Sequence, residues 1–201
     1  MNYLAIDTSG SHLTVIFKIG EKYYEKFIEN CALNHSVVLM PTIDEIKREN
    51  NIDLKDLDFL ACSVGAGSFT GIRIGVSTIK AMAYALNKKV VSVTSFDILA
   101  YNKKGKNLAV LDAKHGSFYA CAYNDNAIEI EPCFIDKEKL LELSKEYNLI
   151  ASQDILGIEV EMVSLVNGLK LALEDKGKTP SEDIDSLIPQ YVRKSQAEEN
   201  R

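Results

Sequence analysis

Short apolar runs separated by turn residues open the chain. Residues 3–7 (YLAID), 13–19 (LTVIFKI) and 22–28 (KYYEKFI) are rich in β-branched and aromatic side chains, and the Gly20-Glu21 pair is typical of a two-residue hairpin turn. We therefore expect three consecutive strands, of which the second and third form a hairpin.

Longer periodic segments follow these strands. Apolar residues recur at helical spacing over 36–49 and over the longer stretch 70–87, whereas the apolar runs at 58–64 and 90–94 predict buried strands. Ser95 is expected to cap a short helix. This alternation of helix and strand favours an α/β fold.

The first block of the chain recurs further along. The order strand, aspartate, turn, strand is repeated about 105 residues later, so that Asp7 falls on Asp112 and residues 13–16 fall on residues 118–121. The same order can arise by chance in α/β proteins, but further elements match as well. The second block continues with predicted strands at 127–131 and 149–151, helices from Asp136 and over 158–173, and a capping box at 179–182 that predicts a last helix.

Two copies of β-β-β-α-β-α, the second abbreviated, are typical of the ribonuclease-H-like fold of actin-like ATPases and sugar kinases. We therefore predict two lobes, each with a mixed β-sheet and helices. Residues 1–104 are expected to form the first lobe, and residues 105–201 a reduced second lobe with a C-terminal tail. In this class, the aspartate that ends the first strand of each lobe faces the cleft and handles metal-bound phosphate.

Composition and charge narrow the class of protein. With 46% hydrophobic residues the chain is not disordered, and its net charge of -6 excludes a protein that grips nucleic acid unaided through a basic patch. Residues 1–124 carry a net charge of +2 and residues 125–201 a net charge of -8. This asymmetry fits either two halves in different surroundings or an acidic solvated surface.

The cysteines and the apolar segments indicate the compartment. No two of the four cysteines form a C-x-x-C pair, and Cys62 and Cys121 lie in apolar strand-like runs, which predicts buried, reduced thiols. No signal peptide or membrane-spanning stretch is visible. We therefore expect a cytoplasmic protein without a membrane partner.

The turn that begins at Asp7 is the first candidate for phosphate chemistry. It supplies a carboxylate, then the hydroxyls of Thr8 and Ser9, then a glycine with a permissive backbone. An ordinary turn is the commoner use of such residues, and Asp112 has the same ambiguity.

The segment 65–75 (GAGSFTGIRIG) is the second candidate. It follows a predicted strand and opens a helix, where N–H groups attract anions, but it matches neither the dinucleotide-binding nor the P-loop spacing. The possible phosphate or nucleotide contacts of the two segments and the repeat, which we expect to be vestigial, are Asp7, Thr8, Ser9, Gly65, Gly67, Ser68, Thr70 and Asp112.

The helix over 70–87 is poor in charge and carries small residues along one edge. Only Arg73 and Lys80 are charged, which indicates a helix buried on more than one side. Such a helix packs against its own sheet or docks a partner protein through an apolar interface, and both interpretations can hold.

The sequence shows no motif for a metal site or for an adenosine pocket. The histidines, His12, His35 and His115, have no metal-binding spacing, and the second block lacks the glycines that line the adenosine pocket of actin-class kinases. A free-standing small-molecule kinase would use Asp7 and Asp112 around Mg-ATP, and a metal-dependent peptidase would need clustered ligands. We keep both classes as alternatives.

Several segments together resemble the bacterial TsaB (YeaZ) family of tRNA threonylcarbamoyladenosine biosynthesis proteins, once labelled glycoprotease-like. The segment SVGAGSFTGIRIG at 63–75 is the most specific, and it departs from the family at Ala66, where proline is usual. A second departure is Val37, where glutamate is usual. The other matching pieces are LAIDTS at 4–9, HSVVLMPTID at 35–44, VVSVTSFDILA at 90–100, LDAKHGSFY at 111–119 and YVRKSQAE at 191–198.

The resemblance implies a two-lobed actin-like fold with a reduced second lobe and a chain without catalysis or a cofactor of its own. Such proteins bind TsaD, the catalytic paralogue with metal-binding histidines, and act with the ATPase TsaE, so ATP and metal are expected on these partners. The complex transfers a threonylcarbamoyl group to the adenosine beside the anticodon of ANN-decoding tRNAs, and tRNA is met only through the complex.

The resemblance also implies where the partner binds. The family uses the helices that follow the first-lobe strands, here 36–49 and 70–87, and family members form homodimers through the same surface when alone. On this interpretation Gly75→Leu abolishes co-purification with TsaD and leaves the fold cooperative. The expected interface residues are Val38, Leu39, Ile43, Gly71, Ile72, Gly75, Val76, Thr78, Ile79 and Met82.

Overall fold

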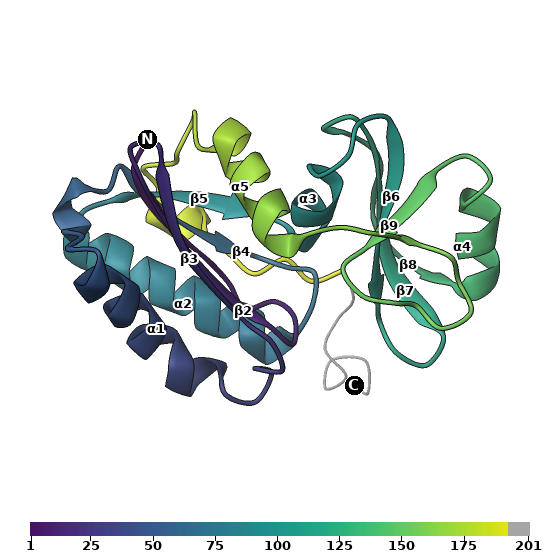
Figure 1. Ribbon diagram of the computed structural model, residues 1–201. Coiled ribbons are helices and arrows are strands. Elements are labelled where there is room, and N and C mark those ends of the chain that lie inside the picture. Colours follow the sequence, from purple (N-terminus) through teal and green to yellow (C-terminus); the bar gives the residue numbers. More distant parts are fainter. Residues whose placement is uncertain (193–201) are drawn as a thin grey trace. The chain divides into compact units, whose positions relative to one another are not determined.

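The computed structural model describes residues 1–192, which form two compact units (Figure 1). The first unit comprises Met1–Val93 and Leu173–Pro189, and the second comprises Thr94–Ala172 and residues 190–192. In this described part of the chain, no helix has both the length and the apolar character that crossing a membrane requires.

The first unit contains a five-stranded mixed sheet and two long helices. In spatial order its strands are β3 (Lys22–Ile28), β2 (Leu13–Ile19), β1 (Tyr3–Asp7), β4 (Phe59–Ser63) and β5 (Lys89–Val93), and its helices are α1 (His35–Glu49), the short η1 (Leu54–Asp56) and α2 (Phe69–Leu86). β1 runs antiparallel to β2 and parallel to β4, which is itself parallel to β5. α1 and α2 lie side by side on one face of this sheet (Figure 1).

The alternation of side chains along the strands builds the core beneath these helices. Leu4 and Ile6 of β1 and Val15 of β2 are fully buried in one cluster with Leu39 of α1 and Ile72 of α2. β1 and β4 are buried at every position, as expected for central strands covered on both faces. The three strands predicted at the start of the chain are confirmed with their bounds.

The second unit repeats this arrangement in reduced form. Its sheet contains β8 (Ala127–Asp136), β7 (Ser117–Asn124), β6 (Lys106–Asp112), β9 (Asn148–Ala151) and β10 (Glu161–Met162), and its short helices are α3 (Ser95–Ala100) and α4 (Lys137–Leu143). Counted along the chain, the strand order of both sheets is third, second, first, fourth, fifth. The predicted two-lobed, ribonuclease-H-like α/β fold is thus confirmed. The second unit is smaller because a loop connects β9 to β10, where the first unit has the helix α2.

The two hairpins of the repeat differ in length by one residue. Asp7 lies opposite Thr14 in the first sheet, whereas Asp112 lies opposite Phe118 in the second. The prediction that aligned Leu13 with Phe118, and so 13–16 with 118–121, is therefore one residue out of register. The second turn is one residue shorter, so a constant shift of 105 residues aligns the strands before the turn but not those after it. The error matters because a slip of one residue moves every side chain of a strand to the other face of the sheet.

The units do not divide after residue 104 as predicted. Thr94, one residue before the predicted Ser95, is the N-cap of α3: the N–H of Asp97 donates to its Oγ1 at 3.0 Å, and its own N–H donates to Asp97 Oδ2 at 2.7 Å. The Tyr123 hydroxyl donates to Asp97 Oδ1 at 3.1 Å. This buried bond ties α3 to β7, so α3 belongs to the second unit.

The segment Leu173–Pro189 returns to the first unit. The Ser181 N–H donates to the Val90 carbonyl at 2.8 Å and the Val90 N–H donates back at 2.9 Å, so the chain continues the sheet beside β5. The prediction of a helix from the capping box at 179–182 is therefore wrong. The backbone groups of Ser181 find hydrogen-bond partners on the free edge of β5, which a helix cap would not give them. The short η2 (Ile184–Ser186) follows this bridge.

The helix predicted over 158–173 begins too early. Residues 158–162 alternate apolar and polar side chains, which is the period of a strand, and this segment runs extended into β10. α5 (Leu165–Lys176) begins only after Ser164, whose Oγ accepts a hydrogen bond from the N–H of Asn167 at 3.2 Å.

Candidate functional site

The turn after β1 and the loop before α2 meet at one edge of the first sheet. β1 and β4 are parallel neighbours, so the chain segments that leave their carboxyl ends emerge together. Ser68 caps α2, its Oγ accepting a hydrogen bond from the N–H of Gly71 at 3.1 Å. The structure therefore brings together the first-unit candidates, which lie in these two segments and the first turn of α2: Asp7, Thr8, Ser9, Gly65, Gly67, Ser68 and Thr70.

Asp7 is buried at the centre of this junction, with 1% of its surface exposed. Its Oδ1 accepts a hydrogen bond from the N–H of Ser9 at 2.8 Å, and its Oδ2 lies 2.9 Å from Nε2 of His12. From the sequence His12 is an isolated histidine without metal-binding spacing. Its pairing with Asp7 carries no spacing signal, because it depends on how the turn folds back on itself.

The two side chains stabilise each other's charged form. Burial by itself would raise the pKa of the Asp7 carboxyl, but the charge of His12 and the hydrogen bonds from His12 and Ser9 hold that pKa below its usual range. Burial by itself would lower the pKa of His12, but the charge and hydrogen bond of Asp7 raise it above its usual value. The site therefore contains a buried pair in which each side chain favours the ionised form of the other.

The glycines of the loop and of α2 are explained by close packing on the turn. The Thr8 hydroxyl donates to the Gly71 carbonyl at 2.8 Å, and a Cβ at Gly71 would lie 2.0 Å from the Thr8 carbonyl oxygen. A Cβ at Gly67 would lie 2.2 Å from the Ser9 carbonyl oxygen, and one at Gly75 would lie 2.5 Å from Thr8 Oγ1. Only glycine lets α2 approach the turn this closely.

The polar groups of the junction bind one another. Both Asp7 oxygens, the Thr8 hydroxyl and the Ser9 N–H have protein partners, and the Ser9 carbonyl accepts a hydrogen bond from the N–H of Ser68 at 2.7 Å. The residues predicted as phosphate contacts are thus neighbours, arranged as a packed polar junction between the turn and α2.

Asp112 occupies the matching position in the second unit, but its surroundings differ. Its Oδ1 accepts a hydrogen bond from the Lys114 N–H at 2.8 Å, and its Oδ2 lies 3.0 Å from Lys114 Nζ. Burial would raise its pKa, but these interactions with Lys114 lower it. Asp112 closes its own turn, which is the ordinary alternative that the sequence left open.

Most of the predicted interface side chains face inward. In the first unit the helices use them to cover the sheet, which corrects the prediction that they form a surface: Leu39, Ile43, Gly71, Ile72, Gly75, Val76 and Ile79 are buried, and Val38, Thr78 and Met82 are half-buried. The apolar stripe of a helix in the sequence marks the side that is buried, and here the sheet buries it.

The outward face of α1 and α2 consists of other residues. On α1, Val37 is 67% exposed and Met40 is 50% exposed. On α2 the exposed positions include small side chains, among them Ser77, Ala81 and Ala85. The two neighbouring helices therefore present apolar and small side chains to solvent.

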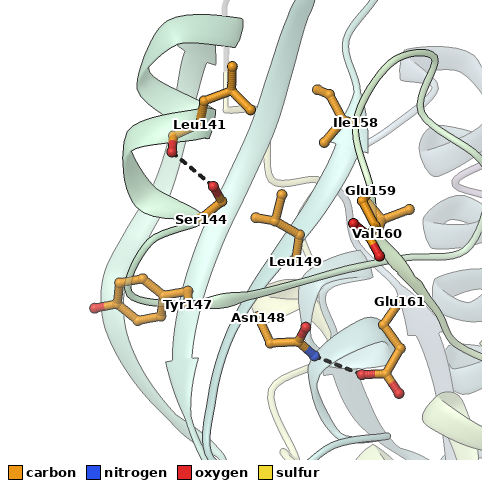
Figure 2. A pocket seen from close by; sticks show the side chains of 9 residues that line it. All are labelled: Leu141, Ser144, Tyr147, Asn148, Leu149, Ile158, Glu159, Val160 and Glu161. Atoms are coloured by element: carbon orange, nitrogen blue, oxygen red, sulfur yellow. Dashed lines mark hydrogen bonds between the residues drawn. The ribbon is translucent and has the colours of Figure 1, made fainter.

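The second unit contains an open groove of about 580 Å³ between α4 and the segment before β10, with β9 at its floor (Figure 2). The Asn148 amide donates to Glu161 Oε2 at 2.7 Å, and the Ser144 hydroxyl donates to the Leu141 carbonyl at 2.8 Å. Its polar groups are thus largely satisfied by each other, and it is lined by none of the predicted site residues. Among residues 1–192, no group of three or more His, Cys, Asp or Glu side chains could hold a metal ion.

Known proteins resemble this chain over nearly all of its length. The family model described as "TsaD: tRNA N6-adenosine threonylcarbamoyltransferase" matches residues 29–177. The tRNA threonylcarbamoyladenosine biosynthesis protein TsaB of Bacillus subtilis (strain 168) is 28% identical, over 98% of this chain and 96% of its own. TsaB of Buchnera aphidicola subsp. Baizongia pistaciae (strain Bp) is 30% identical, over 82% of this chain and 74% of its own.

A solved structure shares the fold. The structure of YeaZ from Pseudomonas aeruginosa superposes with a TM-score of 0.74 at 20% sequence identity, covering 94% of this chain and 99% of its own. At this identity the likeness concerns the fold, and it agrees with the strand order of the two sheets. The terminal motif at 191–198 lies outside the described residues from position 193 onward.

Proposed function

This chain belongs to the TsaB family of tRNA threonylcarbamoyladenosine biosynthesis proteins, and we propose that it serves this biosynthesis as a non-catalytic subunit that binds TsaD through the outward face of α1 and α2. In this proposal TsaE joins the same complex, and ATP and metal are bound by the partner subunits. tRNA is met only through the complex, in keeping with the net charge of -6.

The observation that carries the proposal is the group of exposed apolar and small side chains in the first two turns of α1 and along α2. Exposed apolar side chains gathered on neighbouring elements mark interaction sites, and Met40 and Val37 project from α1 at 50% and 67% exposure. Val37 stands where the resemblance to the TsaB family leads us to expect glutamate, so this departure adds apolar surface to the face. At the start of α2, the Arg73 guanidinium lies 3.7 Å from the centroid of the Phe69 ring, and both residue types are enriched at interfaces.

The small exposed side chains of α2 favour a helical partner. Ser77 and Ala81 lie four residues apart and so share one face of the helix. Small side chains at this spacing let a second helix approach closely, which increases the area of contact. Because both helices are anchored to the sheet by buried side chains, the face is formed before the partner arrives.

The same face also suits self-association. Two copies of one apolar face bury each other through a two-fold axis, so we propose that the chain forms a homodimer when TsaD is absent. The homodimer and the complex with TsaD then compete for the same residues.

The test replaces exposed residues on both helices. Met40→Glu combined with Ala81→Glu leaves the buried core intact and places two charges in the proposed interface, so we expect co-purification with TsaD to be lost. The matched control is Leu156→Glu, because Leu156 is 99% exposed but lies in the second unit. Binding of the double variant with unchanged affinity would overturn the proposal.

Gly75→Leu is not a suitable probe of this interface. A Cβ at Gly75 would already lie 2.5 Å from Thr8 Oγ1, so the larger side chain would force α2 away from the turn. A loss of binding in that variant would report a damaged fold, contrary to the prediction from sequence that the fold stays intact.

A further inference from the structure

The turn at residues 8–12 contacts the first turns of both helices in the proposed interface. The Thr8 hydroxyl donates to the Gly71 carbonyl in the first turn of α2 at 2.8 Å. His35, the first residue of α1, places its Nε2 2.8 Å from the carbonyl oxygen of His12. One short turn therefore holds the beginnings of two helices that are far apart in the sequence.

α1 depends on this contact because its own cap is missing. Asn34 occupies the N-cap position without a side-chain cap hydrogen bond, whereas α2 has Ser68 in that role. The His35 ring is buried, with 1% of the residue exposed, and its Nε2 must donate because a carbonyl can only accept. Just before the helix, the Cys31 N–H donates to the Ser11 carbonyl at 2.5 Å. Two consecutive carbonyls of the turn thus fix the entry to α1.

Only one of the two ring nitrogens of His35 makes a hydrogen bond to a described residue. Its Nδ1 has no hydrogen-bond partner among the described residues, although it is removed from solvent. A buried polar atom without a partner is unfavourable, so packing alone does not explain a histidine at this position. The bond from Nε2 to the turn is the interaction that this ring supplies.

His12 is itself held from three directions. Its Nε2 lies 2.9 Å from Asp7 Oδ2, and its ring stacks on Phe27 of β3 with centroids 5.5 Å apart. A Cβ at Gly10 would lie 2.6 Å from His12 Cε1, so the ring folds closely over the turn. The carbonyl that His35 binds therefore belongs to one of the most constrained residues of the turn.

We infer that Asp7, Thr8, His12 and His35 form a polar clamp that sets the first turn of α1 relative to the first turn of α2, with Thr8 as the contact to α2. In this clamp His12 and His35 are positioning residues for the partner-binding face. The second half of this inference rests on the proposed function. Val37 and Met40 follow His35 within the first two turns of α1, so release of the clamp displaces the exposed apolar side chains of that face.

The test compares two replacements of His35. His35→Leu removes the donor, and we expect amide hydrogen exchange in the first two turns of α1 of the isolated chain to rise by about tenfold or more, with a similar loss of affinity for TsaD. His35→Gln keeps an N–H donor and is expected to recover most of both losses. Rescue by the conservative variant separates the hydrogen bond from the packing of the ring.

Two further variants keep the test decisive. Val91→Ala is the control, because it removes buried volume from β5 without touching the clamp and should leave exchange in the first turns of α1 and the affinity for TsaD unchanged. If His35→Leu does not fold, Phe27→Leu, at a side chain that is 43% exposed, removes the stacking on His12 and should give a smaller rise in the same exchange rates.

The outcomes separate the clamp from the proposed function. Unchanged exchange in the first turns of α1, in either His35→Leu or its substitute Phe27→Leu, overturns the clamp. Failure of His35→Gln to improve on His35→Leu also overturns it. If the unaltered chain does not bind TsaD, the proposed function fails, but the exchange measurements on the isolated chain still decide whether the clamp exists.

Discussion

At the scale of single residues, the Asp7–His12 pair places two titratable side chains in the interior of the first unit. A carboxylate that is 1% exposed is kept charged by one histidine and by the backbone of its own turn. Such a pair stabilises the fold only while both groups are ionised, since removal of either charge leaves the other buried without compensation.

The pair predicts how stability depends on pH. The raised pKa of His12 means that its contribution is complete below about pH 6.5, its ordinary value, and is lost as the pH rises through the folded-state pKa. The lowered pKa of Asp7 means that its contribution is present above about pH 3.9 and is lost as the pH falls through the folded-state pKa. The two contributions overlap between these ordinary values.

The measurement is the free energy of unfolding of the unaltered chain and of His12→Gln between pH 5 and 9, by denaturant titration. Glutamine can donate to Asp7 but cannot become charged. We expect the advantage of the unaltered chain to be largest near the lower end of this range and to shrink as the pH rises. A constant difference between the two proteins would contradict the ion pair.

The thiols follow the pattern predicted from sequence. Cys62 and Cys121 are free and buried, and burial raises the pKa of both thiols, that of Cys121 to about 12. Their role is to fill the apolar interior.

At the scale of elements, α2 is shaped by the turn that it touches. Its inner side has large residues where it packs on the sheet and glycines where it packs on the turn at Thr8. The helix axis therefore lies closer to the turn than to the sheet. The small residues that the sequence predicts along one edge of α2 therefore differ in their surroundings, since Gly71 and Gly75 face the turn, Thr78 is half-buried and Ala85 is exposed. The exposed Ser77 and Ala81 are not among the residues predicted from the sequence.

Gly71→Ala tests the close approach of α2. Alanine favours a helix by about 1 kcal/mol over glycine, but the added Cβ would lie 2.0 Å from a backbone oxygen that cannot move aside easily. We expect the clash to dominate and to lower the free energy of unfolding by about 1–3 kcal/mol. Ser77→Ala, at an exposed position of the same helix, is the control and should change it by less than about 0.5 kcal/mol.

Thermal or urea unfolding of the two variants gives the answer directly. A Gly71→Ala protein as stable as the unaltered chain would mean that α2 does not rest on the Thr8 carbonyl.

At the scale of the whole molecule, the chain has two sheets with the same strand order but different sets of helices. The first unit retains both helices over its sheet, whereas the second replaces the counterpart of α2 by a loop. The polar turn at Asp7 thus has a helix to pack on, whereas in the matching turn Asp112 pairs with Lys114 of the same turn.

The isolated chain should therefore bind Mg-ATP poorly. The groups that the sequence suggests for phosphate, around Asp7 and Ser68, already bind one another, so a nucleotide would have to break these bonds first. We expect isothermal titration calorimetry of the chain with ATP and Mg²⁺ to give no saturable heat. Saturable binding that Asp7→Asn abolishes would contradict this expectation and revive the kinase alternative.

The sequence by itself determined the local elements and, through their repeated order, the fold. Period-two runs and turn residues located the first three strands with their bounds, because adjacent side chains alone decide that pattern. The same reasoning misplaced the start of α5 and the register of the second hairpin, where one segment or one residue departed from the regular repeat.

Only the tertiary structure decided which surface the buried side of each helix packs against. Periodicity shows that Gly75 and Ile79 lie on an inward side of α2, but it cannot distinguish the chain's own sheet from a partner. The pairing of Asp7 with His12 and the contact of Thr8 with Gly71 depend on how a turn folds and on segments distant in the sequence. Long-range contacts of this kind leave no periodic trace along the chain, so they become visible only in the folded molecule.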